Sequence, residues 1–153
     1  MFSSSQDATP REVAIQLLAR REYSRAELAR KLEQKAFAAE EIDACLETLA
    51  EQGLQSDARF AESFIRSRIN RGQGVIRIKG ELSQRGVDRE IATEAFAAVE
   101  EREAVDWFEL ARDTLARRFS SPGATPKERA KRERFLATRG FDFDQIRYAL
   151  DSL

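Results

Sequence analysis

Apolar residues recur along this chain every three or four positions, and no segment alternates apolar and polar residues over the length of a strand. This spacing is typical of amphipathic helices. Nine such segments follow one another between Thr9 and Leu153, so the sequence predicts an all-α fold without a sheet. Residues 1–8 precede the first periodic segment and are predicted to form a disordered lead-in.

Local signals mark where several of these helices begin. Thr9, Ser24 and Thr125 are each followed by a glutamate three positions later, which predicts a capping box at the start of three helices. Ser56 and Asp88 are further candidate N-caps. The seventh helix is predicted to run from about Glu101 to Phe119, where a short loop rich in serine, proline and glycine follows.

The nine predicted helices fall into three groups, because the same apolar positions recur in each group. In order along the groups these are Leu32, Leu82 and Leu136; Phe37, Val87 and Phe141; Ile42, Ala92 and Ile146; Leu46, Phe96 and Leu150; and Leu49, Val99 and Leu153. A unit of about 50 residues buries little core alone. We therefore expect three-helix repeats over 9–54, 55–100 and 101–153, stacked as an elongated, curved array.

Each repeat has a basic residue followed by a small residue at the turn between its second and third helices. These pairs are Lys35-Ala36, Arg85-Gly86 and Arg139-Gly140. A helix that ends in this way places the small residue in the left-handed conformation, which favours glycine. Ala36 fits that conformation poorly, so the first repeat is expected to turn differently.

The composition argues against catalysis. Histidine is absent and Cys45 is the only cysteine, so histidine-based catalysis, the usual zinc sites and an internal disulfide are excluded. No glycine-rich phosphate loop is present either. We expect no enzymatic activity and no cofactor or metal. The lone cysteine indicates a reducing compartment, and no apolar run approaches the roughly 20 residues that span a bilayer; we expect a cytoplasmic monomer.

Basic residues gather in the middle of the chain, although its net charge is −1. Arg66, Arg71, Arg77 and Lys79 lie outside the predicted apolar stripes, Arg85 precedes a turn, and Arg132 belongs to a second basic cluster at 127–139. These six are our candidate partner-binding residues. Solvated helix surfaces with intrahelical ion pairs explain the same charges equally well. The alternative is a basic surface that binds nucleic-acid phosphates or an acidic protein groove.

Arg68 differs from its neighbours because it falls within the apolar arc that contains Phe60, Phe64 and Ile65. Burying an unpaired guanidinium group is costly. An ion pair with an acidic residue is therefore favoured over contact with a ligand.

Four segments of the sequence resemble the RecX family, the regulators of the bacterial recombinase RecA. They are REYSRAELARKL (21–32), SDARFAESFIRSRINRGQG (56–74), IRIKGELSQRGV (76–87) and ERFLATRGFDFDQI (133–146). The resemblance covers Arg11 to Leu153 and departs from the family pattern at Gly80, in mid-helix, and at Ala36.

This resemblance implies a small, non-catalytic regulator of DNA repair, homologous recombination and the SOS response. It implies binding in the groove of the RecA filament on single-stranded DNA, possible contact with that DNA, and inhibition of ATPase and strand exchange. An independent helix-turn-helix-like DNA-binding module is the alternative, although a net charge of −1 and a pI near 5.7 argue against strong affinity for free DNA.

Overall fold

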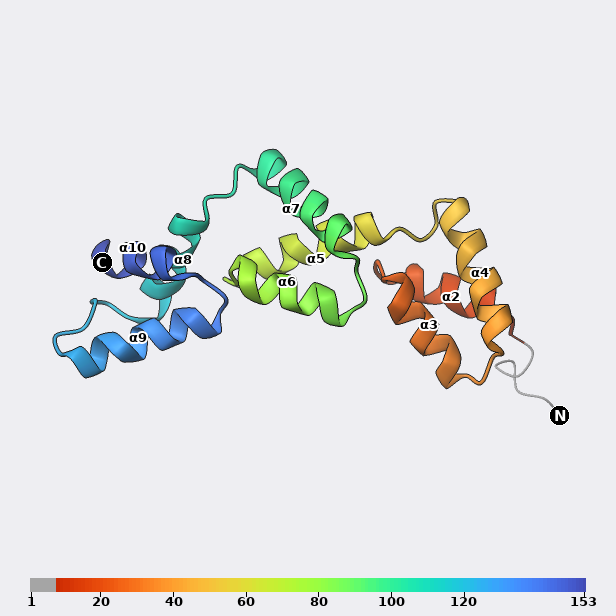
Figure 1. Cartoon of the computed structure of the whole chain (residues 1–153), viewed down its shortest axis with the longest axis horizontal. Coiled ribbons are helices and arrows are strands. Elements are labelled where there is room, and N and C mark those ends of the chain that lie inside the picture. Colours follow the sequence, from red (N-terminus) through yellow and green to blue (C-terminus); the bar gives the residue numbers. More distant parts are fainter. Residues whose placement is uncertain (1–7) are drawn as a thin grey trace.

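A computed structural model describes residues 8–153, which form nine α-helices and no strand. The helices are α2 (Pro10–Leu18), α3 (Arg25–Gln34), α4 (Ala39–Glu51), α5 (Asp57–Asn70), α6 (Val75–Gln84), α7 (Arg89–Glu103), α8 (Trp107–Arg118), α9 (Pro126–Thr138) and α10 (Phe143–Asp151). They follow one another along an elongated molecule in three groups of three (Figure 1). The all-α, tandem three-helix prediction is confirmed. The lead-in predicted for residues 1–8 lies, except for Ala8, outside the described residues.

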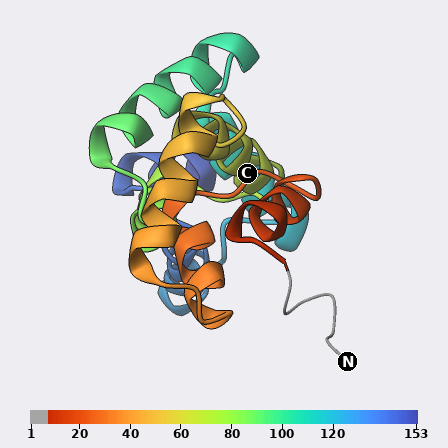
Figure 2. The same cartoon turned by 90° about the vertical axis from the view of Figure 1, so that its right-hand side faces the viewer.

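Each group of helices has an apolar core of its own. We call them module 1 (α2–α4), module 2 (α5–α7) and module 3 (α8–α10). Leu32, Leu82 and Leu136 occupy equivalent positions and are 0% exposed. Burying one such side chain contributes about 1.5–3 kcal/mol. Figure 2 looks along the array from the end of module 1, with the other modules behind it. The stability of the array therefore comes from three small cores and the contacts between them.

The turn between the second and third helices is the same in all three modules. The turn residues Ala36, Gly86 and Gly140 have φ of 66°, 79° and 100°. The following N–H donates to the carbonyl five residues earlier, from Phe37 to Leu32 at 3.3 Å, from Val87 to Leu82 at 3.1 Å and from Phe141 to Leu136 at 3.2 Å. The expectation that module 1 turns differently is therefore wrong. Ala36 takes the left-handed conformation despite a steric cost of about 1–2 kcal/mol.

The predicted capping boxes at Thr9 and Ser24 are confirmed. At Thr125 only one of the two hydrogen bonds of a capping box is formed. The Thr125 hydroxyl accepts the N–H of Glu128 at 3.2 Å, as expected. The Glu128 carboxylate, however, accepts the N–H of Ala124 at 2.7 Å. The glutamate thus holds the preceding loop rather than the N-cap residue.

The boundary between α7 and α8 differs from the sequence prediction. Helix α7 continues to Glu103, and Ala104 ends it in the left-handed conformation, with φ of 48°. Asp106 then caps α8 by accepting the N–H groups of Phe108 and Glu109 at 3.0 and 3.2 Å. The prediction of one helix from Glu101 to Phe119 is therefore wrong. The sequence gives no sign of this break, because neither glycine nor proline marks it.

The two junctions between modules have the same design, in which the turn of one module sits against the start of the second helix of the module before it. At the first junction, Ser24 Oγ donates to the Arg85 carbonyl at 2.7 Å. At the second, the Gly74 N–H donates to the Arg139 carbonyl at 2.8 Å and the Ile76 N–H to the Gly140 carbonyl at 3.1 Å. Ser24 and Gly74 are the N-caps of α3 and α6. The turn therefore closes each module and also docks it onto its neighbour.

Further contacts fix the angle between neighbouring modules. Asp57 accepts the N–H of Arg25 at 2.8 Å across the first junction. At the second junction, the ring of Trp107 packs 6.1 Å from that of Phe96, and its indole N–H donates to Glu100 at 2.7 Å. The start of α8 is thereby packed on module 2.

Candidate functional site

Charge is sorted by helix within the modules. The second helices carry more bases than acids: α3 has Arg25, Arg30 and Lys31 with Glu27 and Glu33, α6 has Arg77 and Lys79 with Glu81, and α9 has Lys127, Arg129, Lys131, Arg132 and Arg134 with Glu128 and Glu133. Helix α4, in contrast, carries Glu40, Glu41, Asp43, Glu47 and Glu51 without a base. In Figure 1, α3, α6 and α9 lie along the lower side of the array, α7 lies along the upper side, and α4 runs down the right-hand end. We call the side formed by α3, α6 and α9 the basic edge.

Lys79 and Arg71 are the two predicted residues whose charge is free for a partner. Both are exposed, and neither forms an ion pair with an acidic residue within 8–153. Lys79 lies on α6, and Arg71 follows the last turn of α5. An exposed cation without a counter-ion is available to a phosphate or a carboxylate at little cost in desolvation.

Arg77 and Arg85 already hold the array together. Arg77 Nε lies 3.5 Å from Glu81, and its Nη1 donates to the Thr138 carbonyl of module 3 at 3.4 Å. Arg85 Nε lies 3.5 Å from Glu27 of module 1. Partner contact by either residue competes with these bonds between modules.

Arg66 and Arg132 are engaged in other ways. Arg66 is on α5, away from the three helices of the basic edge, and pairs with Glu103 at 3.7 Å. Arg132 lies on α9, but its guanidinium group sits 4.4 Å from the centre of the Phe119 ring and donates to the Ser121 carbonyl at 2.8 Å. Arg132 thus fastens the loop that precedes α9. The structure does not bring the six predicted residues together into one cluster.

Arg68 forms the ion pair favoured by the sequence. Its Nε donates to Glu81 at 3.0 Å, its side chain is 12% exposed, and its guanidinium group lies 4.2 Å from the centre of the Phe64 ring. Arg85 lies over the same ring at 4.7 Å. These contacts make Arg68 a structural residue of module 2.

A cleft of about 260 Å³ lies where modules 1 and 2 meet. Its lining includes Arg21 and Glu22 from module 1 and Phe64, Arg71 and Arg85 from module 2. Two serine hydroxyls, those of Ser63 and Ser67, also face it. The cleft combines positive charge, serine side chains and two aromatic residues, Phe60 and Phe64, which suits phosphate groups or acidic side chains.

Sequence reasoning missed Arg21 as a member of this cleft. Arg21 precedes the N-cap Ser24 by three positions, as Arg71 precedes the N-cap Gly74. Extending the repeat alignment toward the start of each second helix would have paired the two arginines. The cleft itself depends on how modules dock, which periodicity along the chain does not report.

Two other ionisable groups, Cys45 and Tyr148, have a raised pKa. Partial burial raises the pKa of the Cys45 thiol, which keeps it protonated and a weak nucleophile. The pKa of Tyr148 is also raised, chiefly because its hydroxyl donates to the Glu109 carboxylate. Within residues 8–153 no three His, Cys, Asp or Glu side chains are grouped to hold a metal ion. In the same part of the chain, no helix is long and apolar enough to cross a membrane.

Three stacked three-helix modules with charge sorted between two sides define a tandem helical-repeat protein. Models of the first, second and third three-helix domains of RecX match residues 11–49, 56–95 and 104–150. The chain belongs to the RecX family.

Individual relatives agree with this assignment over nearly the whole chain. The regulatory protein RecX of Chromohalobacter salexigens is 58% identical over 147 residues, which cover 96% of this chain and 94% of the relative. That of Vibrio vulnificus is 42% identical, covering 92% and 90%. The crystal structure of RecX from Lactobacillus salivarius superposes with a TM-score of 0.76 at 26% identity, covering 94% of each chain.

Proposed function

We propose that this protein binds the filament that RecA forms on single-stranded DNA, inhibits its ATPase and strand exchange, and so modulates DNA repair and recombination. Membership of a family of regulatory proteins supports this proposal. The observation that carries it furthest is the basic edge, which extends over three modules. Extended surfaces of stacked repeats suit partners that are themselves built from repeating units. The proposal includes a non-catalytic role in the cytoplasm.

We assign the strongest contacts to Lys79, on the basic edge, and to Arg71, at the end of α5, because their charges are free. Arg77 is 40% exposed, but it already contacts Glu81 and the Thr138 carbonyl, so its contribution is weaker. Arg66, Arg85 and Arg132 are weaker contributors, because each must first give up a bond within the protein. Losing an existing ion pair offsets much of what a new one contributes.

The test is ATP hydrolysis by RecA on single-stranded DNA while this protein is titrated in, together with co-sedimentation of the protein with filaments. We expect hydrolysis to fall and the protein to pellet. An R71E/K79E variant should require at least about tenfold more protein for the same inhibition, because each lost charge-assisted contact is worth about 1 kcal/mol or more.

The matched control is R102E/R112E, which changes the net charge equally. Arg102 is exposed and Arg112 half-buried, and they pair with Glu62 at 2.9 Å and Glu109 at 3.2 Å. The control should inhibit like the unaltered protein. Unchanged hydrolysis and no co-sedimentation with the unaltered protein would reject the proposed function, whereas equal loss in both variants would move the contact away from Arg71 and Lys79.

An independent DNA-binding module is the second candidate, favoured by the unpaired bases of the basic edge. Such a module neutralises many phosphates at once, so its affinity for naked DNA should fall steeply with salt concentration. The net charge of −1 argues against this. Tight binding to naked DNA with a steep salt dependence would favour this second candidate.

A further inference from the structure

A hollow of about 280 Å³ lies between the two later helices of module 2. Lys79 and Ser83 line it from α6, and Arg89 and Thr93 line it from α7. Val87 and Ala92 contribute apolar surface and are themselves buried, at 6% and 8% exposure. The hollow therefore has two cationic walls and an apolar floor. It is separate from the cleft between modules 1 and 2.

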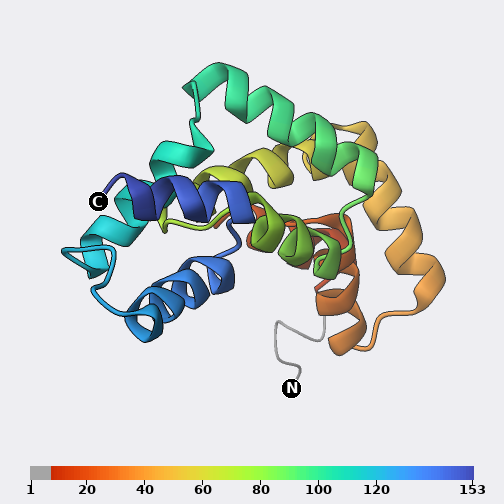
Figure 3. The same ribbon diagram turned by 60° about the vertical axis from the view of Figure 1, so that its left-hand side comes forward.

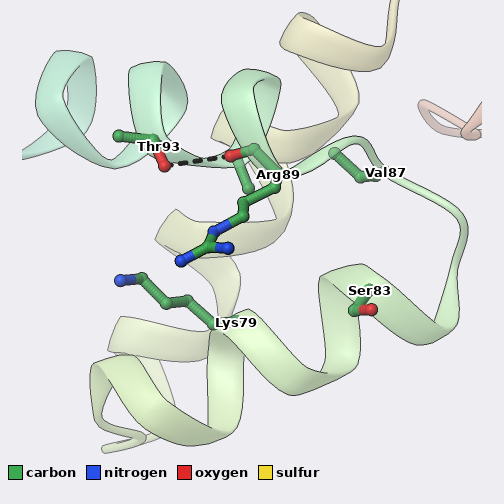
Figure 4. Close-up of a pocket in the computed structure, with 6 residues that line it drawn as sticks. Lys79, Ser83, Val87, Arg89 and Thr93 are labelled. Atoms are coloured by element: carbon green, nitrogen blue, oxygen red, sulfur yellow. Dashed lines mark hydrogen bonds between the residues drawn. The ribbon is translucent and has the colours of Figure 1, made fainter.

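The side-chain ends of Lys79 and Arg89 point toward one another across this hollow (Figure 4). Two like charges repel, so this arrangement is stable only with solvent or an anion between them. The chain supplies no such anion, because neither residue forms an ion pair within the described residues. No acidic residue occurs three or four positions from either of them along the chain.

The position of Arg89 lowers the stability of the fold when no anion is bound. It is the first residue of α7, where the positive end of the helix dipole disfavours a cation by about 0.3–1 kcal/mol. The Thr93 hydroxyl donates to the Arg89 carbonyl at 2.9 Å, which ties the two residues of this wall together. Ser83 also lines the hollow, and its hydroxyl makes no hydrogen bond within residues 8–153. The local geometry thus costs stability and leaves donors unused.

We propose that this hollow is a subsite for one backbone phosphate of single-stranded nucleic acid, held between Lys79 and Arg89. This deepens the proposed function and rests on it for the source of the phosphate. Cations on opposite walls suit oxygens that point in several directions, as in a phosphate. A carboxylate is planar and is bound best by the two parallel N–H groups of one guanidinium.

The size of the hollow favours a nucleotide unit over a free phosphate ion. Its volume is roughly twenty times the space of about 10–15 Å³ that holds one water molecule. The apolar surface of Val87 and Ala92 provides a floor for the sugar next to the bound phosphate. Contacts to phosphate and sugar carry no base information, so binding here is independent of sequence.

The experiment measures binding of the free protein to fluorescein-labelled (dT)20 by anisotropy at several salt concentrations, beginning at low salt. Replacing both cations in K79Q/R89Q should weaken binding on the order of tenfold. If the two cations share one phosphate, the slope of log K against log salt should fall by about 0.7. Amide NMR shifts of Ser83, Val87 and Thr93 on adding the oligonucleotide should disappear in the variant.

The control R102Q/R112Q changes net charge equally and should bind the oligonucleotide like the unaltered protein. Inorganic phosphate and polyglutamate serve as competing probes, and each should need a much higher anion concentration to shift the same amides. Unchanged binding by K79Q/R89Q, no binding by the unaltered protein at low salt, or equal shifts with either competing probe would overturn the subsite. RecA is absent from this assay, so its outcome is separate from that of the ATPase titration.

Discussion

Replacing Gly74 by alanine adds one Cβ atom at the junction between modules 2 and 3 and so tests how closely the two modules pack there. Gly74 has φ of −92° and ψ of 172°, a conformation open to alanine, so the backbone itself is not strained by the change. The added Cβ, however, would lie 2.4 Å from the Gly140 carbonyl oxygen and 2.8 Å from the Phe141 nitrogen. Both atoms belong to backbone that a side-chain rotation cannot move away.

The size of the effect follows from these distances. Ordinary contact begins near 3.4 Å, so the turn must retreat by about 1 Å. That movement breaks the hydrogen bonds from Gly74 and Ile76 to the Arg139 and Gly140 carbonyls, now 2.8 and 3.1 Å long. Two bonds at about 0.5–1.5 kcal/mol each predict a loss of about 1–3 kcal/mol.

Gly80→Ala is the matched control in the same helix. A Cβ at Gly80 meets nothing within 4 Å, and alanine in a helix interior is favoured over glycine by about 0.5–1 kcal/mol. Urea unfolding followed by circular dichroism should therefore show Gly74→Ala less stable, and Gly80→Ala more stable, than the unaltered protein. Equal stability of all three, with the Ile76 amide still protected from hydrogen exchange, would refute this account of the junction.

Three further predictions concern single residues. Ala36→Gly should raise the free energy of unfolding by about 1 kcal/mol, since Ala36 has φ of 66°; an unchanged urea midpoint would contradict this. Arg68→Met should lower it by about 1–2 kcal/mol, because Glu81 loses its 3.0 Å partner, whereas Arg102→Met at an exposed pair should change it by less than about 0.5 kcal/mol. Hydrogen bonds from the backbone N–H and hydroxyl of Thr9 lower the pKa of Glu12 below its ordinary 4.5. Its stabilisation of α2 is therefore complete above pH 4.5 and lost as the pH falls through the folded-state pKa, which amide exchange at Val13 reports; exchange independent of acid pH would oppose it.

The fold could be predicted because its signals are local. Leu32, Leu82 and Leu136 recur at one spacing, and Thr9 and Ser24 begin their helices with complete capping boxes. The break at Ala104 could not be predicted, because an alanine in the left-handed conformation gives no signal in sequence. Burial of Leu32 and partial burial of Phe37, on either side of Ala36, likewise override the preference of the turn for glycine.

The site was less predictable than the fold, because the role of each arginine depends on tertiary contacts. The sequence places Arg66 and Lys79 equally on exposed helix surface, yet Arg66 pairs with Glu103 and Lys79 has a free charge. Arg85 reaches Glu27, 58 positions away along the chain, only because the turn of module 2 docks on α3. In Figure 3, the end of α6 lies beside α3 of module 1, which shows how docking brings distant segments together.

An electron cryo-microscopy map of this protein on RecA filaments would test the central claim most directly. The account predicts density for the three modules along the filament, with α3, α6 and α9 facing it and Arg71 and Lys79 at the contact. Density in which α4 and α7 face the filament and the basic edge faces solvent would contradict it.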